Sequence, residues 1–377
     1  MRTILAPPDA ADNSDRGDRL FPMRRPLLSA PLALAFALLG SASSAEDAPP
    51  PPTIRGVGLT MHSKDPTYDY GPFLAELPAL GVTDVCVFVH FYQPHGRSPQ
   101  PARHPLKTPT DRAILSVLRT IRRLGLRAAL LPIVLLERPR ADEWRGNIAP
   151  PDRRGRTRGD PNFAGPFWDP WWRGYRREVL HFARLAQEGG ATLFCVGSEL
   201  SSTEGLTRRW ENLIDDVRRV FSGRLTYSAN WDHYQHPRFW KHLDCIGLSG
   251  YYELSRDPDA PQEELSGTWL GIRQRLLDWR ADRGLTDKPF LFLEIGYPSL
   301  DGGAVKPWDY TQESPPDLEE QRMAYQAFAD AWRGRPELLG VFFYEWWGRG
   351  GPQDRGYTPR GKPALEVLRA FFATKER

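Results

Sequence analysis

Thr192-Leu-Phe-Cys-Val-Gly-Ser-Glu199 is a short apolar run that ends in a glutamate, and the same arrangement returns in Pro289-Phe-Leu-Phe-Leu-Glu294. A buried strand gains nothing from a charge at its end, so each carboxylate is expected to face a ligand. If both strands belong to one parallel barrel, the two carboxylates converge on its C-terminal face, where barrel enzymes build their sites. Paired carboxylates in such a place are what glycoside hydrolysis requires.

Eight strand-like runs alternate with amphipathic stretches along the chain. The runs are almost continuously apolar, which is typical of strands buried on both faces of a parallel sheet. They are Ile54–Thr60, Asp84–Phe91, Arg127–Leu135, Thr192–Ser198, Arg224–Ala229, Cys245–Gly250, Phe290–Glu294 and Gly340–Tyr344. The helical stretches include Asp111–Leu124, Trp172–Gln187, Leu206–Phe221, Thr268–Arg283 and Leu318–Arg333. The pattern predicts a single-domain α/β fold, a (β/α)₈ TIM barrel, over residues 54–377.

The N-terminus has the features of an export signal. Met23-Arg-Arg-Pro is basic, Leu27 to Leu39 is apolar but short for a bilayer span, and Ser43-Ser-Ala45 offers a cleavage site. We therefore expect residues 1–45 to be an N-terminal extension plus signal peptide, with Met23 as the start, and 46–53 to be a proline-rich linker. The expected location is periplasmic or secreted, without stable membrane insertion after cleavage. An uncleaved signal would instead anchor the protein to the membrane.

Composition narrows the choice of partners. The 377 residues carry a formal net charge of +3, so nothing favours nucleic acid as a partner. The three cysteines, Cys86, Cys195 and Cys245, each lie within an apolar run. Strand alternation places them in one interior layer on non-adjacent strands, too far apart for a disulfide, so we expect three reduced thiols. We expect a monomer.

Two long connections follow strand ends. The first, Glu137 to Pro170, is rich in Arg, Pro and Gly and leads into the aromatic stretch Gly165–Trp172. We expect its arginines to be solvated and its aromatic residues to form the wall of a cleft. The second, Gly296 to Pro316, follows the strand that carries Glu294.

The residues at the predicted C-terminal strand ends are carboxylates, an amide and aromatics, a set suited to a carbohydrate. Beyond the two glutamates, those expected to bind substrate are His90, Tyr92, Ser198, Asn230, Trp231, Tyr251 and Trp346. Two-residue steps in the chain place Glu199, Gly197 and Cys195 on one face of their strand. By the same alternation only one of Trp346 and Trp347 points inward, and we expect Trp346 to form the floor of the sugar site.

Other polar residues near strand ends allow less specific interpretations. Glu345 could be a third participant in the reaction or could pair with a loop arginine such as Arg349. His233 and His236 have a weak metal-ligand spacing, but no further ligand is evident near them in the sequence. We therefore expect no metal and no cofactor.

Several motifs, in order, resemble those of glycoside hydrolase family 113. They are Phe194-Cys-Val-Gly-Ser-Glu-Leu200, Leu225-Thr-Tyr-Ser-Ala-Asn-Trp231, Phe239-Trp with Leu243-Asp-Cys-Ile-Gly247, Phe292-Leu-Glu-Ile-Gly-Tyr-Pro-Ser299 and Pro307-Trp-Asp-Tyr310. The resemblance extends over roughly Ile54 to Phe372, and together the motifs are more specific than any one alone. It implies a (β/α)₈ retaining enzyme acting on β-1,4-mannan or manno-oligosaccharides by double displacement.

The resemblance also implies roles. In the wider clan the strand-four glutamate is the acid/base, the strand-seven glutamate is the nucleophile, and a tyrosine after strand six orients the nucleophile. These roles correspond to Glu199, Glu294 and Tyr251. The clan often has asparagine before the acid/base, where it binds the sugar 2-hydroxyl. Here the residue is Ser198, so Asn230 or a water would have to serve that hydroxyl.

Two alternatives stay open. One is a catalytically inactive, carbohydrate-binding TIM barrel, although a pure binder has no need to keep both glutamates and the tyrosine. The other is a glycosidase for a different β-glycan, because a fold does not determine a substrate.

Overall fold

The computed structural model describes residues 53–140, 143–150 and 168–373. The signal peptide and nearly all of the linker predicted for residues 1–53 lie outside these ranges, as does the whole stretch from 151 to 167. All the described residues belong to the compact unit Ala48–Arg377. No helix in the described ranges is long and apolar enough to cross a membrane.

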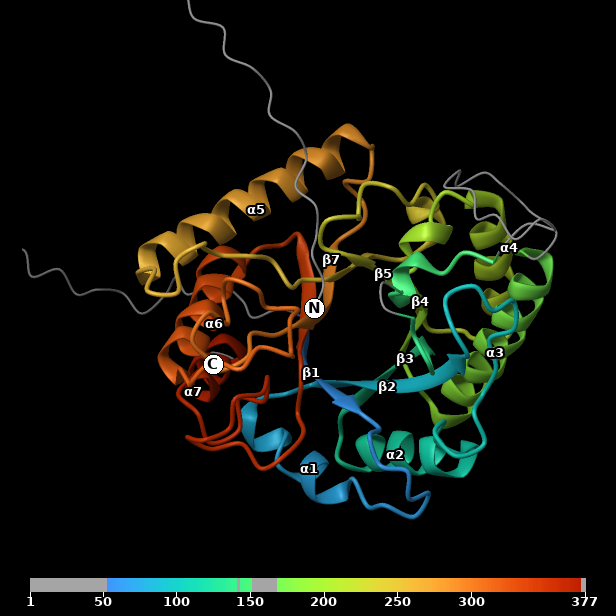
Figure 1. The fold of residues 1–377 in the computed structure, drawn as a ribbon, viewed down its shortest axis with the longest axis horizontal. Coiled ribbons are helices and arrows are strands. Elements are labelled where there is room, and N and C mark those ends of the chain that lie inside the picture. The colour runs from blue at the N-terminus through green and yellow to red at the C-terminus, as the bar shows by residue number, and fades with distance from the viewer. Residues whose placement is uncertain (1–52, 141–142, 151–167, 374–377) are drawn as a thin grey trace, which may run out of the picture. The chain divides into compact units, whose positions relative to one another are not determined.

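Eight parallel strands close into a barrel in sequence order, with β1 paired to β8 (Figure 1). The strands are β1 (Ile54–Thr60), β2 (Asp84–Gln93), β3 (Arg127–Leu136), β4 (Leu193–Ser198), β5 (Arg224–Asn230), β6 (Ile246–Ser249), β7 (Phe290–Ile295) and β8 (Leu338–Phe343). All eight lie where the apolar runs predicted them, within two residues at either end. The (β/α)₈ prediction is confirmed.

Helices surround the strands on the outside of the barrel (Figure 1). They are α1 (Gly71–Ala75), α2 (Asp111–Arg123), α3 (Trp168–Gly189), α4 (Thr207–Arg218), α5 (Gln262–Asp282), α6 (Leu318–Trp332) and α7 (Ala364–Phe372). Helices α3 and α5 begin four and six residues earlier than predicted. Between β5 and β6 the described chain forms no α-helix, only the 3₁₀ turn Trp240–His242, so that one crossover departs from the regular βα repeat.

Local sequence explains how α2 begins and ends. The Thr110 hydroxyl accepts a hydrogen bond from the Ala113 amide, as expected of an N-cap, and Gly125 adopts a φ of 76° just beyond the helix. At α4 the chain first forms the 3₁₀ turn Ser201–Thr203, and the helix begins only at Thr207, without a side-chain cap.

The barrel interior is filled by a separate layer of apolar side chains. It contains all three cysteines together with residues such as Phe88, Leu293 and Phe342. The cysteines are buried and free, which confirms the predicted thiols. Burial raises the pKa of Cys195 and of Cys245 to about 12, so these groups stay protonated.

The aromatic residues at the start of α3 do not form a cleft wall as predicted. Trp171 is fully buried, stacks on Tyr175 with ring centroids 4.8 Å apart, and donates its indole N–H to the Gln93 side chain at 2.8 Å. Trp172 packs edge-on against Trp210 of α4. These rings are therefore part of the packing between α3, α4 and the barrel.

Candidate active site

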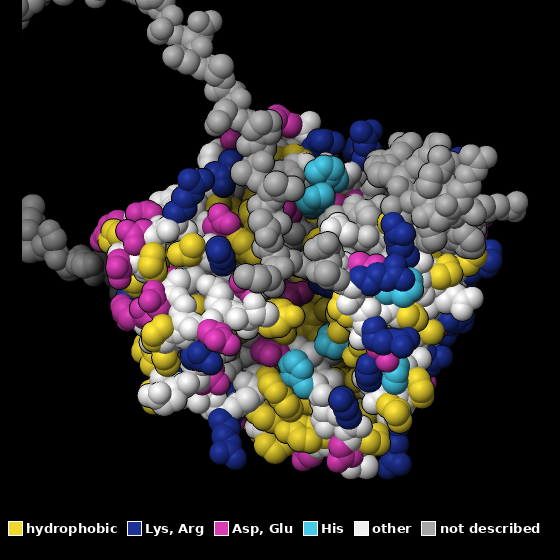
Figure 2. All heavy atoms as spheres, viewed as in Figure 1, with side chains coloured by type: hydrophobic (Ala, Val, Ile, Leu, Met, Phe, Trp, Pro, Cys, Tyr) yellow, Lys and Arg dark blue, Asp and Glu magenta, His cyan; other side chains and the backbone are white. Residues whose placement is uncertain are grey.

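The two glutamates lie at the C-terminal ends of β4 and β7. Glu199 follows the last residue of β4, and its amide donates to the Ser228 carbonyl at 2.8 Å. Glu294 is the fifth residue of β7 and is paired in register with Ser249 of β6. Only 8% of Glu199 and 7% of Glu294 is exposed, so both carboxylates are largely removed from water. Figure 2 shows acidic and histidine side chains gathered near a hollow at the centre of one face.

A β-bulge near the end of β4 changes the direction in which the residues before Glu199 point. The pairing of β4 with β5 shifts register between Cys195 and Ser198. A Cβ at Gly197 would lie 2.6 Å from the Trp210 ring, on the helix side of the sheet, whereas Cys195 faces the interior. The prediction that Gly197 and Cys195 share a face is therefore wrong, because a bulge interrupts the alternation.

The backbone of Glu199 is in a strained conformation. Its φ is +50°, and no other non-glycine residue in the described ranges has a positive φ. A left-handed conformation costs a residue with a Cβ on the order of 1–2 kcal/mol, and such strain collects at functional sites. The rest of the fold therefore offsets this conformational free energy and keeps the Glu199 carboxylate in its position.

Glu294 is held by one hydrogen bond and is otherwise desolvated. The Tyr251 hydroxyl donates to Oε2 at 2.9 Å, as predicted, while buried Oε1 has no hydrogen-bond partner among the described residues. Burial, and then the negative charge of Glu199, raises the pKa of Glu294 to about 7, against opposing contributions from Arg145 and Tyr251. Glu294 therefore holds a proton in a large fraction of molecules near neutral pH.

This shift predicts a pH dependence of stability. Between pH 4.5 and about 7 the folded protein keeps a proton on Glu294 that the unfolded chain has lost, so folding stability falls as the pH rises. We expect Glu294→Gln to remove this loss. Relative to wild type, it should gain on the order of 3 kcal/mol in the free energy of unfolding between pH 4.5 and 7.5, at 1.36 kcal/mol per pKa unit. Urea unfolding at both pH values measures the difference. An equal gain in Glu263→Gln, on the exposed surface of α5, would contradict the assignment to Glu294.

Glu199 has a partner that the sequence did not indicate. Arg145, in the 3₁₀ turn Arg145–Asn147 of the β3–α3 connection, donates to Glu199 Oε2 at 2.5 Å. The same guanidinium bonds the Ser198 carbonyl and reaches Ser198 Oγ at 3.3 Å. Only 12% of the Arg145 side chain is exposed, so the expectation that this connection's arginines are solvated is wrong for Arg145. The segment carries seven arginines, and no local pattern distinguishes this one.

Two histidines lie on the β1 and β2 side of the site. His90 is on the interior face of β2, and burial lowers its pKa to about 4, helped by His62 and Arg145, so the ring is neutral at pH 7. His62 Nε2 lies 3.0 Å from Glu345 Oε2. The alternative pairing of Glu345 with Arg349 is therefore wrong, and the carboxylate partner is a histidine.

A group of tyrosines surrounds Glu294, and the sequence interpretation missed two of them. The Tyr344 ring lies 6.4 Å from that of Tyr251 and 5.5 Å from that of Tyr357, centroid to centroid. The Glu294 charge contributes to raising the pKa of both added tyrosines, which places them near the carboxylate. Tyr357 was missed because it lies in the segment after β8, far in the sequence from any predicted strand end.

The expectation for Trp346 is wrong. It is 2% exposed, its indole N–H donates to the Phe73 carbonyl at 2.9 Å, and Arg360 lies over its ring. Trp347 is instead the partly exposed ring, 5.3 Å from His62 and stacked on Phe73. Strand β8 ends at Phe343, so strict alternation no longer holds at these positions.

The other predicted substrate-binding residues lie around the same strand ends. Trp231 stacks on Trp308, from the connection after β7, at 5.7 Å. Asn230 donates its amide to Asp232 at 2.8 Å, so this donor is already engaged. Tyr92 packs edge-on against His104 with Lys107 above its ring, and neither contact links it to the carboxylate pair.

A group of side chains near the site is able to ligate a metal. Glu204, His233 and His236 each offer one ligand atom, and these atoms lie within 4.8 Å of one another. The expectation that nothing completes the set of histidines is thus wrong. Glu204 is 29 residues away in the sequence from the nearer histidine and meets it only in the fold.

Comparison with known proteins gives the family. The family model for glycoside hydrolase family 113 matches residues 72–361, which is most of the chain. No curated protein matched.

Solved structures agree with the family match. A family 113 β-mannanase from Alicyclobacillus acidocaldarius has 28% sequence identity and a TM-score of 0.72, and the match covers 85% of this chain and 98% of that one. A family 113 β-1,4-mannanase, at 24% identity with a TM-score of 0.72, covers 86% and 99%. A β-glucuronidase from Ruminococcus gnavus shares only the fold, with 11% identity, a TM-score of 0.53 and coverage of 85% and 50%. The chain therefore belongs to glycoside hydrolase family 113 and is a glycoside hydrolase built on a (β/α)₈ barrel.

Proposed function

We propose that this protein is a retaining glycosidase that cleaves β-1,4-mannan or manno-oligosaccharides. The observation that carries the proposal is the buried pair of Glu199 and Glu294, with Tyr251 bonded to one oxygen of Glu294 and the other oxygen left without a hydrogen-bond partner. The likeness to a β-mannanase at 28% identity supports the substrate class.

In the first step, Glu294 Oε1 attacks the anomeric carbon while Glu199 gives its proton to the departing glycosidic oxygen, which leaves as an alcohol. In the second step, Glu199 takes a proton from water, whose oxygen attacks the same carbon and releases Glu294 as a carboxylate. Two inversions give net retention. Tyr251 stays bonded to Oε2, which leaves Oε1 as the attacking atom.

The proton must move for this sequence to begin. In the free site Arg145 pairs with Glu199, while burial favours the proton on Glu294. Glycosylation needs the reverse arrangement. We infer that substrate entry separates Arg145 from Glu199 and desolvates that carboxylate, so that the proton held by Glu294 transfers to it. Arg145 then has donors available for a sugar hydroxyl, the role that Ser198 is too short to fill.

Arg145→Gln provides a test of this arrangement. Because the guanidinium lowers the pKa of Glu294, its loss should move the acid limb of the kcat/KM profile upward by about one pH unit and lower kcat/KM. The matched control is Arg140→Gln, an exposed arginine of the same connection. A shift of the same size in Arg140→Gln, or no shift in Arg145→Gln, would contradict the role.

Two aromatic surfaces are candidates for stacking on sugar rings. One is formed by Trp231 and Trp308, of which Trp308 is 37% exposed. The other is formed by Trp347, His62 and Tyr68, whose rings lie within 6 Å of Trp347. Platforms contributed by the connections after β1, β5, β7 and β8 fit an oligosaccharide better than a single sugar.

The test of the function is a product profile. Purified protein is incubated with β-1,4-manno-oligosaccharides, cello-oligosaccharides and activated aryl β-glycosides, and the first anomer released is followed by NMR. We expect turnover of the manno-oligosaccharides and a β-anomer first. An α-anomer first would refute retention, preference for cello-oligosaccharides would select the other-glycan alternative, and sugar binding without turnover would select the inactive binding barrel.

We further propose that the protein acts after export, as a monomer. The support is the sequence of residues 23–45, with its basic start, short apolar stretch and small residues before Glu46. An N-terminal sequence of the protein recovered from the native host tests cleavage.

A further inference from the structure

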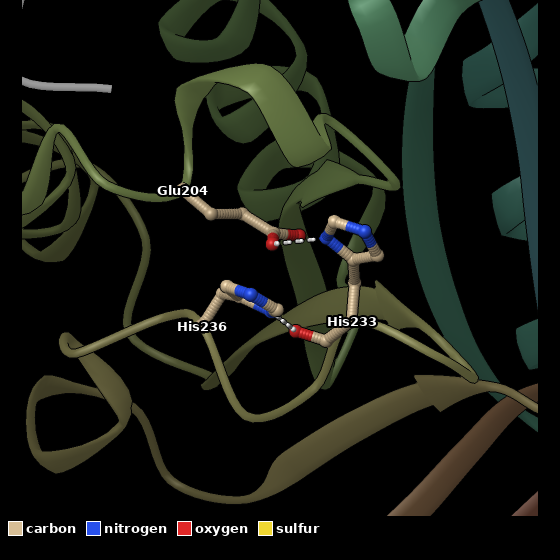
Figure 3. Close-up of side chains that lie close together, drawn as sticks. All are labelled: Glu204, His233 and His236. Atoms are coloured by element: carbon tan, nitrogen blue, oxygen red, sulfur yellow. Dashed lines mark hydrogen bonds and ion pairs between the residues drawn. The ribbon is translucent and has the colours of Figure 1, made fainter. Parts of the chain in front are cut away.

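Glu204, His233 and His236 form a compact group outside the carboxylate pair (Figure 3). Glu204 directly follows the 3₁₀ turn Ser201–Thr203 in the connection from β4 to α4. The two histidines lie in the connection after β5, between Asn230 and the turn Trp240–His242. The group therefore joins the segment that follows Glu199 to the segment that follows Asn230.

Glu204 and His233 each have a buried polar atom that makes no hydrogen bond within the described part of the chain. Glu204 is fully buried, and neither its Oε2 nor His233 Nδ1 has a hydrogen-bond partner among the described residues. The two atoms face each other at 3.7 Å, close enough for an ion pair but too far for a hydrogen bond. Two ligands of one tetrahedral zinc ion, each about 2.1 Å from the metal, would lie about 3.4 Å apart. The observed 3.7 Å is the length of an ion pair and is also close to the separation of two ligands that share one cation.

The other atoms of the group are already oriented. The Tyr227 hydroxyl donates to Glu204 Oε1 at 2.9 Å and accepts from the Leu200 amide at 2.9 Å, which leaves Oε2 as the free oxygen. His236 Nδ1 lies 3.2 Å from the His233 carbonyl, so it carries the hydrogen and leaves Nε2 with a lone pair. Ligands of bound metals are commonly held by such outer hydrogen bonds.

From this geometry we propose that Glu204, His233 and His236 bind one Zn²⁺ ion. Two imidazoles and one carboxylate suit zinc, whereas Mg²⁺ and Ca²⁺ prefer oxygen ligands alone. His236 is exposed, so an ion can enter from solvent and a water can complete the tetrahedron. The ion takes no part in the double displacement. It ties together the connections after β4 and β5, and so supports the strained backbone at Glu199.

The experiment uses the full chain without an affinity tag, freed of metal by a chelator that is then removed. Zn²⁺ is titrated by calorimetry, and Co²⁺ is used as a spectroscopic probe because a tetrahedral site gives intense visible absorption. We expect one Zn²⁺ per chain and a thermal midpoint raised by about 3 °C or more at saturation. The exposed His236→Gln should weaken binding at least about tenfold without unfolding the protein. Glu204→Gln should weaken it further.

The matched control is His242→Gln, since His242 Nε2 faces a single carboxylate, Glu211, at 3.4 Å with no third ligand in the described ranges. This variant should bind Zn²⁺ as wild type does. The proposal is overturned if the metal-free protein takes up no stoichiometric Zn²⁺. Equal binding by wild type and His236→Gln, or equal loss in His242→Gln, would overturn it as well. These readouts are independent of glycosidase activity.

Discussion

Glu294→Ala is expected to lower turnover of β-1,4-manno-oligosaccharides by about 10⁴-fold or more, because it removes the atom that attacks the anomeric carbon. The cavity left by the side chain lies against Tyr251 and can admit a small anion. Added azide should therefore restore turnover of an activated aryl β-mannoside and give the α-mannosyl azide, formed by a single inversion. Mass spectrometry and NMR of the product measure both points.

The control for this prediction is Glu263→Ala, in which an exposed carboxylate on the first turn of α5 is removed. It should have wild-type activity and give no azide product. If Glu294→Ala instead yields the β-mannosyl azide, Glu294 is the acid/base and the two roles are exchanged. The azide product tests this directly, and the test matters because burial raises the pKa of Glu294 in the free site.

Glu199→Ala is expected to show an activity loss that depends on the leaving group. Natural oligosaccharides, whose alcohol leaving groups need a proton, should lose turnover by about 10²–10⁴-fold. Aryl β-mannosides with acidic phenols should still form the glycosyl-enzyme, with the second step becoming slow, so a burst of phenol precedes a low steady rate. Azide should accelerate that second step without needing a general base and should give the β-mannosyl azide.

The loss of Glu199 also leaves Arg145 without its carboxylate partner, so fold integrity needs a separate check. Glu199→Gln keeps the shape of the side chain and can still accept from Arg145. Equal loss on aryl and natural substrates in both variants, with no burst, would contradict the acid/base role. A matched thermal midpoint for Glu199→Gln and wild type would show that the change lies in the chemistry.

The barrel could be predicted because its strands are encoded locally. Each run has to be apolar on both faces to lie between helices and barrel interior, and this produces the same recognisable signal eight times. The ends of helices were less well predicted at α3 and α5, where tertiary packing extends the helix beyond its clearest periodicity. Between β5 and β6 the sequence has no amphipathic stretch that predicts a helix, and the described chain forms no α-helix there.

The site could be predicted only where residues lie on strands or directly after them. Glu199, Glu294 and Tyr251 follow apolar runs, and the resemblance to family 113 added their expected roles. Arg145, Tyr357 and Trp347 come from connections, where alternation no longer applies and many arginines or aromatics are equivalent in the sequence. The error at Gly197 has a similar cause, because a bulge adds a residue that alternation does not anticipate.

Sequence alone determined that two carboxylates end buried parallel strands four and seven, because apolar runs and their terminal charges are properties of neighbouring residues. Tertiary structure decided which groups meet them. It brought Arg145 to Glu199, placed Tyr251 on one oxygen of Glu294, and set Glu204 beside His233. Ionisation in a buried site depends on distances between charges and on exclusion of water. Both arise only when segments far apart in the chain pack together.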